Sequence, residues 1–252
     1  MSTPTRVLAV IPAAGAGTRL GRSMPKALVE IDADTRIVDV VLDAVAPHAD
    51  GVALVVAPNF EENLARPLVL TPACPLLLRI QESPTGMCDA LRCSEDLWAD
   101  YDCLAVVWGD QVNVSTHTVA RAIQLHGGRT SRIVIPTVER ISPYVQYIFG
   151  DSNLIDVREA REGHAMDPAG RSDVGVFIIS ASELAPLLDD YEAYQARSVV
   201  TGELNLLPFF PHAARRGWLV EQLDIVNVHE AIGVNTQDEL DFAASRIRGA
   251  RQ

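Results

Sequence analysis

Lysine is almost missing from this chain, although arginine is common. The 252 residues include twenty arginines and a single lysine, Lys26. An ammonium group is a compact point charge on a flexible stem, whereas a guanidinium group is a rigid planar fork. A lysine kept in a chain that otherwise uses arginine is therefore a candidate for a task that the larger group does not fit. The alternative is a surface lysine without a role.

Other scarcities exclude whole classes of protein. The net charge of −12 argues against a nucleic-acid partner, which calls for a basic face. Aromatic residues make up 6% of the chain, and its apolar mass of 48% is mostly Ala, Val, Leu and Ile, as is typical of an α/β protein with buried strands. We find no membrane-spanning run and no secretory signal, so we expect a cytoplasmic protein without a membrane partner.

The cysteines do not form a recognisable metal or disulfide pattern. Cys74, Cys88, Cys93 and Cys103 lack C-x-x-C spacing, and no paired histidines lie near them in the sequence. This spacing argues against a zinc site. We predict free thiols that are mainly buried.

Apolar runs alternate with helix-period stretches through the first half of the chain. This alternation indicates βαβ crossovers and a mainly parallel sheet in a single α/β domain over residues 1–252. The second half contains β-rich segments without long helices between them, which indicates an antiparallel insertion. The predicted strands are 7–11, 51–57, 76–80, 104–108, 132–136, 144–149, 154–157 and 174–179, and the predicted helices are 37–46, 85–98, 116–126, 182–188 and 237–247.

The turn after the first strand is rich in glycine. Gly15, Gly17 and Gly21 give the spacing G-x-G-x-x-x-G, which differs from the dinucleotide fingerprint, and the Gly-Lys-Ser/Thr end of a Walker loop is missing. Closely spaced glycines let backbone N–H groups approach phosphate oxygens. Arg19 and Lys26 add positive charge, so the turn is a candidate phosphate-binding loop.

This turn resembles the signature of sugar-1-phosphate nucleotidyltransferases, through Ala13-Ala14-Gly15-Ala16-Gly17-Thr18-Arg19 followed by Met24-Pro25-Lys26-Ala27-Leu28. The resemblance implies a three-layer α/β/α nucleotidyltransferase fold, GT-A-like and Rossmann-like, with a mainly parallel mixed sheet and a β-rich sugar-side insertion. It implies that Arg19 and Lys26 stabilise charge while an acceptor phosphate attacks the α-phosphorus of an NTP and pyrophosphate leaves. The nucleotide phosphates would be wrapped by Ala13, Ala14, Gly15, Gly17 and Thr18.

A second segment, residues 81–91, resembles the base-recognition segment of this family. A strand ends, a Pro-x-Gly turn follows and a helix begins. The resemblance implies that the Gln81 amide and the Gly86 backbone read the edge of the nucleobase, since an amide both donates and accepts. A plain strand-to-helix turn is the alternative. Met87 stands where relatives often carry Thr, which leaves the base open.

Two further segments resemble the magnesium site of the family. Gly109 and Asp110 follow the strand at 104–108 and match its Gly-Asp pair, which also contacts the nucleotide, while Asn235 lies in a Gly-Val-Asn segment before the last helix. Both supply oxygen ligands of the kind that Mg²⁺ prefers. The alternatives are an ordinary turn residue for Asp110 and a helix cap for Asn235 or Thr236.

Weaker similarities in the middle of the chain concern the acceptor. Tyr144, Glu159, Asp173 and Glu203 match sugar-side segments, in the order closest to the N-acetylglucosamine-1-phosphate uridylyltransferase type. Val145 replaces the Gly of the family, and Asp173 replaces its Asn. Both departures lie in the sugar-facing half, so the identity of the acceptor stays open.

The resemblance implies an Mg²⁺-dependent enzyme that transfers a nucleoside monophosphate from an NTP to a sugar 1-phosphate. Residues 1–137 would form the nucleotide-binding half, and 138–252 the acceptor half with the C-terminal helix. Two alternatives stay open: a cytidylyltransferase that acts on a phosphocholine- or phosphonate-like acceptor, and a catalytically silent subunit that binds a nucleotide sugar. A homo-oligomer is compatible with the sequence.

Overall fold

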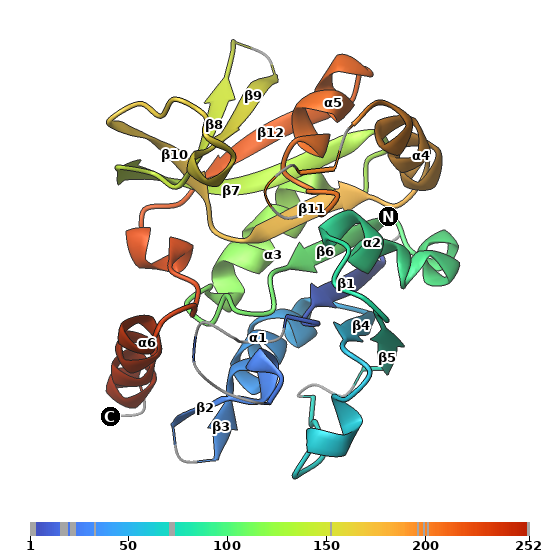
Figure 1. Ribbon diagram of the computed structural model, residues 1–252. Helices are drawn as coiled ribbons and strands as arrows, with labels where there is room; N and C mark the ends of the chain where they lie inside the picture. The colour runs from blue at the N-terminus through green and yellow to red at the C-terminus, as the bar shows by residue number, and fades with distance from the viewer. Residues whose placement is uncertain are drawn as a thin grey trace.

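A ten-stranded mixed sheet runs through the computed structural model of the protein (Figure 1). The structure describes residues 4–250 except 16–19, 21–23, 33, 71–73, 152, 196, 199 and 201. The strands of the sheet are β1 (Val7–Pro12), β4 (Gly51–Val56), β5 (Leu76–Ile80), β6 (Cys103–Val107), β7 (Arg132–Ile141), β8 (Val145–Phe149), β9 (Leu154–Glu159), β10 (Ala169–Asp173), β11 (Val176–Ser180) and β12 (Leu219–Asp224). A separate pair consists of β2 (Glu30–Asp32) and β3 (Thr35–Arg36).

The strand directions confirm the predicted mixed sheet. The order is β5-β4-β1-β6-β11-β7-β10-β8-β9, and β12 pairs with β7. Pairing is parallel from β5 to β6 and between β7 and β12, and it is antiparallel from β6 through β11 to β9. All strands therefore run in one direction except β9, β10 and β11, which belong to the β-rich insertion.

Helices cover both faces of the sheet, which confirms the three-layer α/β/α architecture. In β1, Val7, Ala9 and Ile11 pack into one apolar core, and Leu8 and Val10 pack into the other, because successive strand residues point to opposite faces. The first core contains α1 (Ile37–Val45), α3 (Thr116–His126) and α6 (Gln237–Ala250). The second contains α2 (Met87–Arg92), α4 (Leu184–Tyr194) and α5 (Phe209–Arg215).

Several boundaries differ from the sequence predictions. The helix predicted at 85–98 ends at Arg92, and a 3₁₀ helix follows at Glu95–Asp100. Ser94 causes the break: its hydroxyl donates to the Leu91 carbonyl at 2.9 Å and accepts from the Trp98 indole N–H at 3.1 Å, in competition with regular helix bonding. The strand β7 continues five residues beyond the predicted end at 136, and α5 and β12 were not predicted.

The four cysteines are free thiols, as predicted. Cys88 and Cys103 are buried, whereas Cys74 and Cys93 are half-buried. Burial raises the pKa of Cys103 to about 12, so its thiol stays protonated at neutral pH. Within the described part of the chain, no helix has both the length and the apolar character that crossing a membrane requires.

A buried histidine should make the stability of the fold depend on pH. His126 is fully buried, and its Nε2 lies 3.2 Å from both the Arg132 carbonyl and the Ser180 hydroxyl. Burial lowers its pKa from 6.5 to about 4. The unfolded chain therefore takes up this proton first, and the stabilising effect, complete above about pH 6.5, is lost toward pH 4.

We expect His126→Gln to reduce the loss of unfolding free energy between pH 7 and pH 5 by about 2 kcal/mol relative to the unmodified protein. Urea unfolding at the two pH values measures this difference. His117→Gln, on the exposed side of the same helix, is the matched control and should leave the pH dependence unchanged. Equal pH dependence in the His126 variant and the unmodified protein would contradict the assignment.

Candidate active site

Two clefts meet at the carboxyl ends of β1 and β6, the edge where open α/β sheets bind ligands. They have volumes of about 260 and 460 Å³ and share Trp108 and Asp110 as a common wall. The first cleft is lined by Pro12, Ala13, Ala14, Gly15, Lys26, Ala27, Gln81, Pro84, Gly86, Met87, Trp108, Gly109, Asp110 and Glu203. The second is lined by Trp108, Asp110, Gln111, Arg140, Tyr144, Val145, Ser172, Asp173, Leu207, Ala231, Ile232, Gly233, Asn235 and Glu239.

The first cleft brings together the described residues that were predicted to bind a nucleotide: Ala13, Ala14, Gly15, Gln81, Gly86 and Gly109, with Lys26 beside them. Gly17, Thr18 and Arg19, which were predicted for the same loop, lie outside the described residues. Their roles stay predictions. The sheet brings these residues together, because β1 and β6 are parallel neighbours and the turns that follow the two strands lie at the same edge of the sheet.

Gly109 allows these two turns to touch. Its backbone N–H donates to the Pro12 carbonyl oxygen at 3.1 Å. A Cβ atom at this position would lie 2.6 Å from the same oxygen and 3.0 Å from the Ala13 Cβ, which is too close for any side chain. The glycine in the Gly-Asp motif is therefore required by packing, and it sets Asp110 directly beside the glycine-rich turn.

The Gln81–Gly86 turn forms a second wall of the first cleft. The Gln81 amide Nε2 donates to the Gly86 carbonyl oxygen at 3.0 Å, and Gln81 is only 9% exposed. Gly86 has a φ of +124°, and a Cβ atom there would lie 2.5 Å from the Leu204 carbonyl oxygen. Leu204 in turn donates its backbone N–H to the Thr85 carbonyl at 3.0 Å. The turn is thus fixed against a segment more than a hundred residues later.

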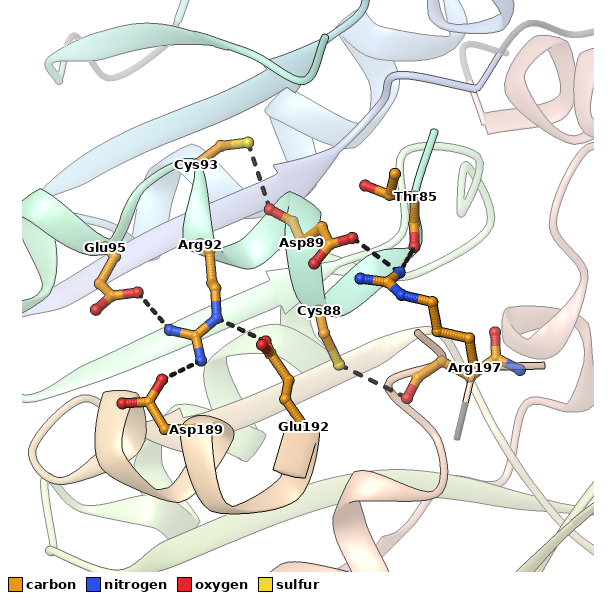
Figure 2. Close-up of polar contacts among 10 residues, drawn as sticks. Thr85, Cys88, Asp89, Arg92, Cys93, Glu95, Asp189, Glu192 and Arg197 are labelled. Atoms are coloured by element: carbon orange, nitrogen blue, oxygen red, sulfur yellow. Dashed lines mark hydrogen bonds and ion pairs between the residues drawn. The ribbon is translucent and has the colours of Figure 1, made fainter. Parts of the chain in front are cut away.

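Arginines hold the helix that follows this turn (Figure 2). Arg92 of α2 reaches three carboxylates, Glu95 at 2.8 Å and, on α4, Asp189 at 2.6 Å and Glu192 at 2.7 Å. Arg197 donates through one nitrogen to the Thr85 carbonyl at 2.9 Å and lies 3.3 Å from the Asp89 carboxylate, so it joins the turn to the start of α2. Sequence reasoning gave neither arginine a role, because their partners are distant in the chain.

Lys26 lies where the two clefts meet. Its Nζ donates to Asp110 Oδ2 at 2.6 Å and to Asn235 Oδ1 at 2.8 Å. These partners are 84 and 209 positions away in the sequence. The Lys26 and Asp110 side chains are 16% and 23% exposed, so the ion pair is largely shielded from water. One ammonium thereby joins the glycine-rich turn, which is predicted to bind phosphate, to both predicted metal ligands.

Three hydrogen bonds, one between backbone groups and two between a side chain and the backbone, bring the Asp110 turn and the Asn235 turn together. The Val234 N–H donates to the Asp110 carbonyl at 3.0 Å, and the Asn113 amide donates to the Ile232 carbonyl at 2.8 Å. The Ser115 N–H donates to the Glu230 carboxylate at 3.1 Å. These links fix the main chain on both sides of the ammonium.

The helix-capping alternative applies to Thr236 and leaves the Asn235 side chain available. The Thr236 hydroxyl accepts from the Glu239 N–H at 3.3 Å, and the Glu239 carboxylate accepts from the Thr236 N–H at 2.9 Å and the Asn235 N–H at 2.7 Å. This reciprocal pattern is a capping box at the start of α6. The Asn235 Oδ1 atom instead faces Lys26.

The donor set at Asp110 and Asn235 fits a small hard cation. Their two side-chain oxygens already converge on one positive charge, the Lys26 ammonium. Mg²⁺ prefers oxygen ligands and commonly takes one or two protein oxygens together with substrate phosphates and water. Among the described residues, no group of three or more His, Cys, Asp or Glu side chains could hold a metal without such help.

The predicted acceptor residues separate into different positions. Tyr144 and Asp173 line the second cleft, but Glu203 lines the first. Glu159 is 2% exposed and lines neither, and burial raises its pKa. Sequence reasoning missed Arg140, which lines the second cleft on the part of β7 that extends past the predicted strand end. Trp108 could have been found, since it directly precedes the Gly-Asp motif.

Comparison with known proteins agrees with this geometry. A family model described as a MobA-like NTP transferase domain matches residues 9–201. The chain is 28% identical over 254 residues to the bifunctional protein GlmU of Aquifex aeolicus, covering 95% of this chain and 53% of the relative. It is 29% identical over 241 residues to the bifunctional protein GlmU of Chelativorans, covering 92% and 51%. The chain therefore spans about half the length of these relatives.

The family resemblance that the motifs indicated is thus confirmed by an independent match that covers most of the chain. The match begins within β1 and includes the glycine-rich turn, Gln81, Gly86 and Asp110. The chain is a nucleotidyltransferase that belongs to the family of MobA-like NTP transferase domains.

Proposed function

We propose that the protein transfers a nucleoside monophosphate from an NTP to a sugar 1-phosphate, releases pyrophosphate and uses Mg²⁺. Family membership supports the nucleotidyl transfer, and the acceptor and the metal are our proposals. The observation that supports them most is the position of Lys26, Asp110 and Asn235 at the junction of two clefts. One cleft would hold the NTP and the other the acceptor, and we place the reaction in the cytoplasm.

The proposed reaction needs positioning and charge stabilisation without a covalent intermediate. An oxygen of the acceptor phosphate attacks the α-phosphorus of the NTP, while the bond from this phosphorus to the bridging oxygen breaks and pyrophosphate leaves. The Lys26 ammonium stabilises the negative charge on the phosphoryl oxygens in the transition state. The shared wall of Trp108 and Asp110 holds the two substrates next to each other.

Asp110 and Asn235 would hold the Mg²⁺ ion, with phosphate oxygens and water as the remaining ligands. When bound, the ion neutralises charge on the phosphates. The two oxygens that would hold the ion accept from Lys26 in the free protein. We therefore infer that Lys26 exchanges these partners for phosphate oxygens when the nucleotide and the metal bind.

A substrate screen tests the proposal. All four NTPs are combined with a panel of sugar 1-phosphates, phosphocholine and phosphonates, and pyrophosphate release is measured. We expect release with a sugar 1-phosphate and Mg²⁺. Release only with CTP and either phosphocholine or a phosphonate would support the second candidate instead. Asp173 in the second cleft favours this candidate where the acceptor carries a cationic group. Nucleotide-sugar binding without release for any pair would indicate a silent subunit.

Arg197 should position the base-reading turn without touching the reacting atoms. Its loss would free the Thr85 carbonyl and Asp89. We expect Arg197→Ala to raise KM for the NTP about fivefold with little change in kcat, as for the loss of a partly exposed charged hydrogen bond. Steady-state kinetics with varied NTP measures this, with the exposed Arg248→Ala on α6 as control. An unchanged KM, or an equal loss in kcat, would contradict a positioning role.

A further inference from the structure

The second cleft combines carboxylates with aromatic rings. Among its described lining residues, Asp110, Asp173 and Glu239 are acidic, and Arg140 is the basic one. Trp108 and Tyr144 supply two rings, and the Tyr144 side chain is mostly exposed. Such a lining is a poor environment for an acceptor that is negatively charged throughout. It suits a molecule that carries a positive group in addition to its phosphate.

Most charges in this lining already have partners. Asp110 is paired with Lys26 at 2.6 Å. Glu239 accepts two backbone N–H groups at the start of α6. Arg140 donates to the Ala231 carbonyl at 3.2 Å. Asp173 is different, because it forms no ion pair with any described residue. It accepts the backbone N–H of Gly175 at 2.7 Å and is hydrogen-bonded to the Tyr147 hydroxyl, and burial raises its pKa.

Two buried polar side chains, Tyr147 and Glu159, lie behind Asp173. Tyr147 is 3% exposed and Glu159 is 2% exposed, and the Glu159 Oε1 atom has no hydrogen-bond partner among the described residues. Glu159 Oε2 has one cation nearby, Arg161 at 3.5 Å. Burial raises the pKa of Tyr147, and the Asp173 charge raises it further, so these groups are electrostatic neighbours.

The strand register directs Glu159 toward the same cleft. Glu159 on β9 lies directly opposite Val145 on β8, and cross-strand partners project from the same face of a sheet. Val145 lines the second cleft. The Glu159 carboxylate therefore lies beneath this part of the cleft, adjacent to Asp173, and adds to the negative potential there. Asp173 has no counter-ion among the described residues, and a charged carboxylate beside a second, buried carboxylate is costly, so a ligand cation there would be stabilising.

We infer that the acceptor carries a positively charged nitrogen and that Asp173 selects it. This inference rests on the proposed function, since it assigns the substrate class of the second cleft. A carboxylate accepts hydrogen bonds and cannot donate them, whereas an asparagine at this position would do both. An ammonium group supplies the matching charge and N–H donors, and the faces of Trp108 and Tyr144 favour a cation as well. The acceptor class is a phosphorylated amine, either an amino sugar 1-phosphate or an amino-alcohol phosphate.

Matched pairs of acceptors test this selection and separate the two sources. Glucosamine 1-phosphate is compared with glucose 1-phosphate, and phosphoethanolamine with propyl phosphate, each with its best NTP. We expect at least about a tenfold higher kcat/KM for the amine in one pair, since a hydrogen bond to a charged group contributes about 1.5–3 kcal/mol. The pair that shows this preference identifies the source. Equal or better use of the neutral member in both pairs would overturn the inference.

Asp173→Asn removes the charge while keeping the oxygen that accepts the Gly175 N–H. We expect it to reduce the preference for the amine about tenfold or more, mainly through KM of the charged acceptor, and to leave KM for the NTP near its original value. Asp156→Asn is the matched control, because this carboxylate is 52% exposed on β9 and lies outside both clefts. A preference that survives Asp173→Asn would contradict the role of Asp173.

Calorimetric binding of the same four acceptors separates this inference from the proposed function. Amine-dependent binding that weakens in Asp173→Asn, without pyrophosphate release from any NTP, would refute the transfer reaction and support the cation site. Efficient turnover of glucose 1-phosphate over glucosamine 1-phosphate would support the reaction and refute the cation site. Thermal unfolding of Asp173→Asn shows whether the variant keeps its fold, and a folded variant with unchanged amine binding would also refute the site.

Discussion

Replacing Lys26 by alanine is expected to lower kcat/KM by about 10²-fold or more, equivalent to about 2.7 kcal/mol of transition-state stabilisation. Among the described residues, Lys26 supplies a cation at the junction of the two clefts. Its Nζ lies 2.6 Å from Asp110 Oδ2 and 2.8 Å from Asn235 Oδ1. Charge that develops on the phosphoryl oxygens there would lose its nearest stabilising group. Pyrophosphate release under subsaturating NTP measures the effect.

Lys26→Met keeps most of the side-chain stem and serves as the companion variant. It should lose as much activity as the alanine variant. The methionine keeps the packing of the stem but removes the positive charge, and we expect the charge to be what the reaction needs. Both variants leave the carboxylate of Asp110 without its ion-pair partner, so their folding is checked by thermal unfolding. Near-normal turnover in either folded variant would refute the role given to Lys26.

Replacing Asp110 by alanine is expected to abolish metal-dependent turnover, with a loss of about 10³-fold, while the protein still folds. The change removes one of the two side-chain oxygens that converge at the junction, whereas the Val234 hydrogen bond uses the Asp110 main-chain carbonyl and remains. Turnover is measured as a function of Mg²⁺ concentration. Asp100→Ala, which removes an exposed carboxylate at the end of the 3₁₀ helix Glu95–Asp100, is the control.

Direct metal binding gives a second readout that does not depend on turnover. Mn²⁺ binding to the free protein, followed by electron paramagnetic resonance, should weaken in Asp110→Ala. It should strengthen in Lys26→Met, because the ammonium no longer competes for the oxygens of Asp110 and Asn235. Full Mg²⁺-dependent activity in folded Asp110→Ala would contradict the metal assignment. Mn²⁺ affinity that is the same in both variants as in the unmodified protein would contradict it as well.

The positions of the turns that line the first cleft could be predicted from local sequence. Ala13 to Gly15 and Gly109–Asp110 each follow a buried strand, and parallel neighbours such as β1 and β6 place such turns at one edge. The apolar runs also gave the two halves of the sheet, because a buried parallel strand needs a continuous apolar stretch. Gly86 could be located from its turn, although its need for a positive φ became evident only beside Leu204.

The parts that depend on distant contacts were not predictable in this way. Periodicity could not show the break at Ser94, which comes from two side-chain hydrogen bonds. The sequence left a helix cap as the alternative to a ligand role for Asn235, and only the folded chain shows that Thr236 caps α6. Glu203 and Glu159 matched acceptor motifs, yet one lines the first cleft and the other is buried behind the second, because strand register and loop packing decide where each side chain projects.

The long strand β7 has a consequence for how the protein can be divided. It pairs with β10 and β11 along one edge and with β12 along the other, and β12 comes after residue 201, where the family match ends. A chain cut at that point would expose the second edge of β7 and lose α6, which packs into the first core. It would also lose Asn235. The smallest unit to be expressed or exchanged between relatives as one piece therefore extends through α6.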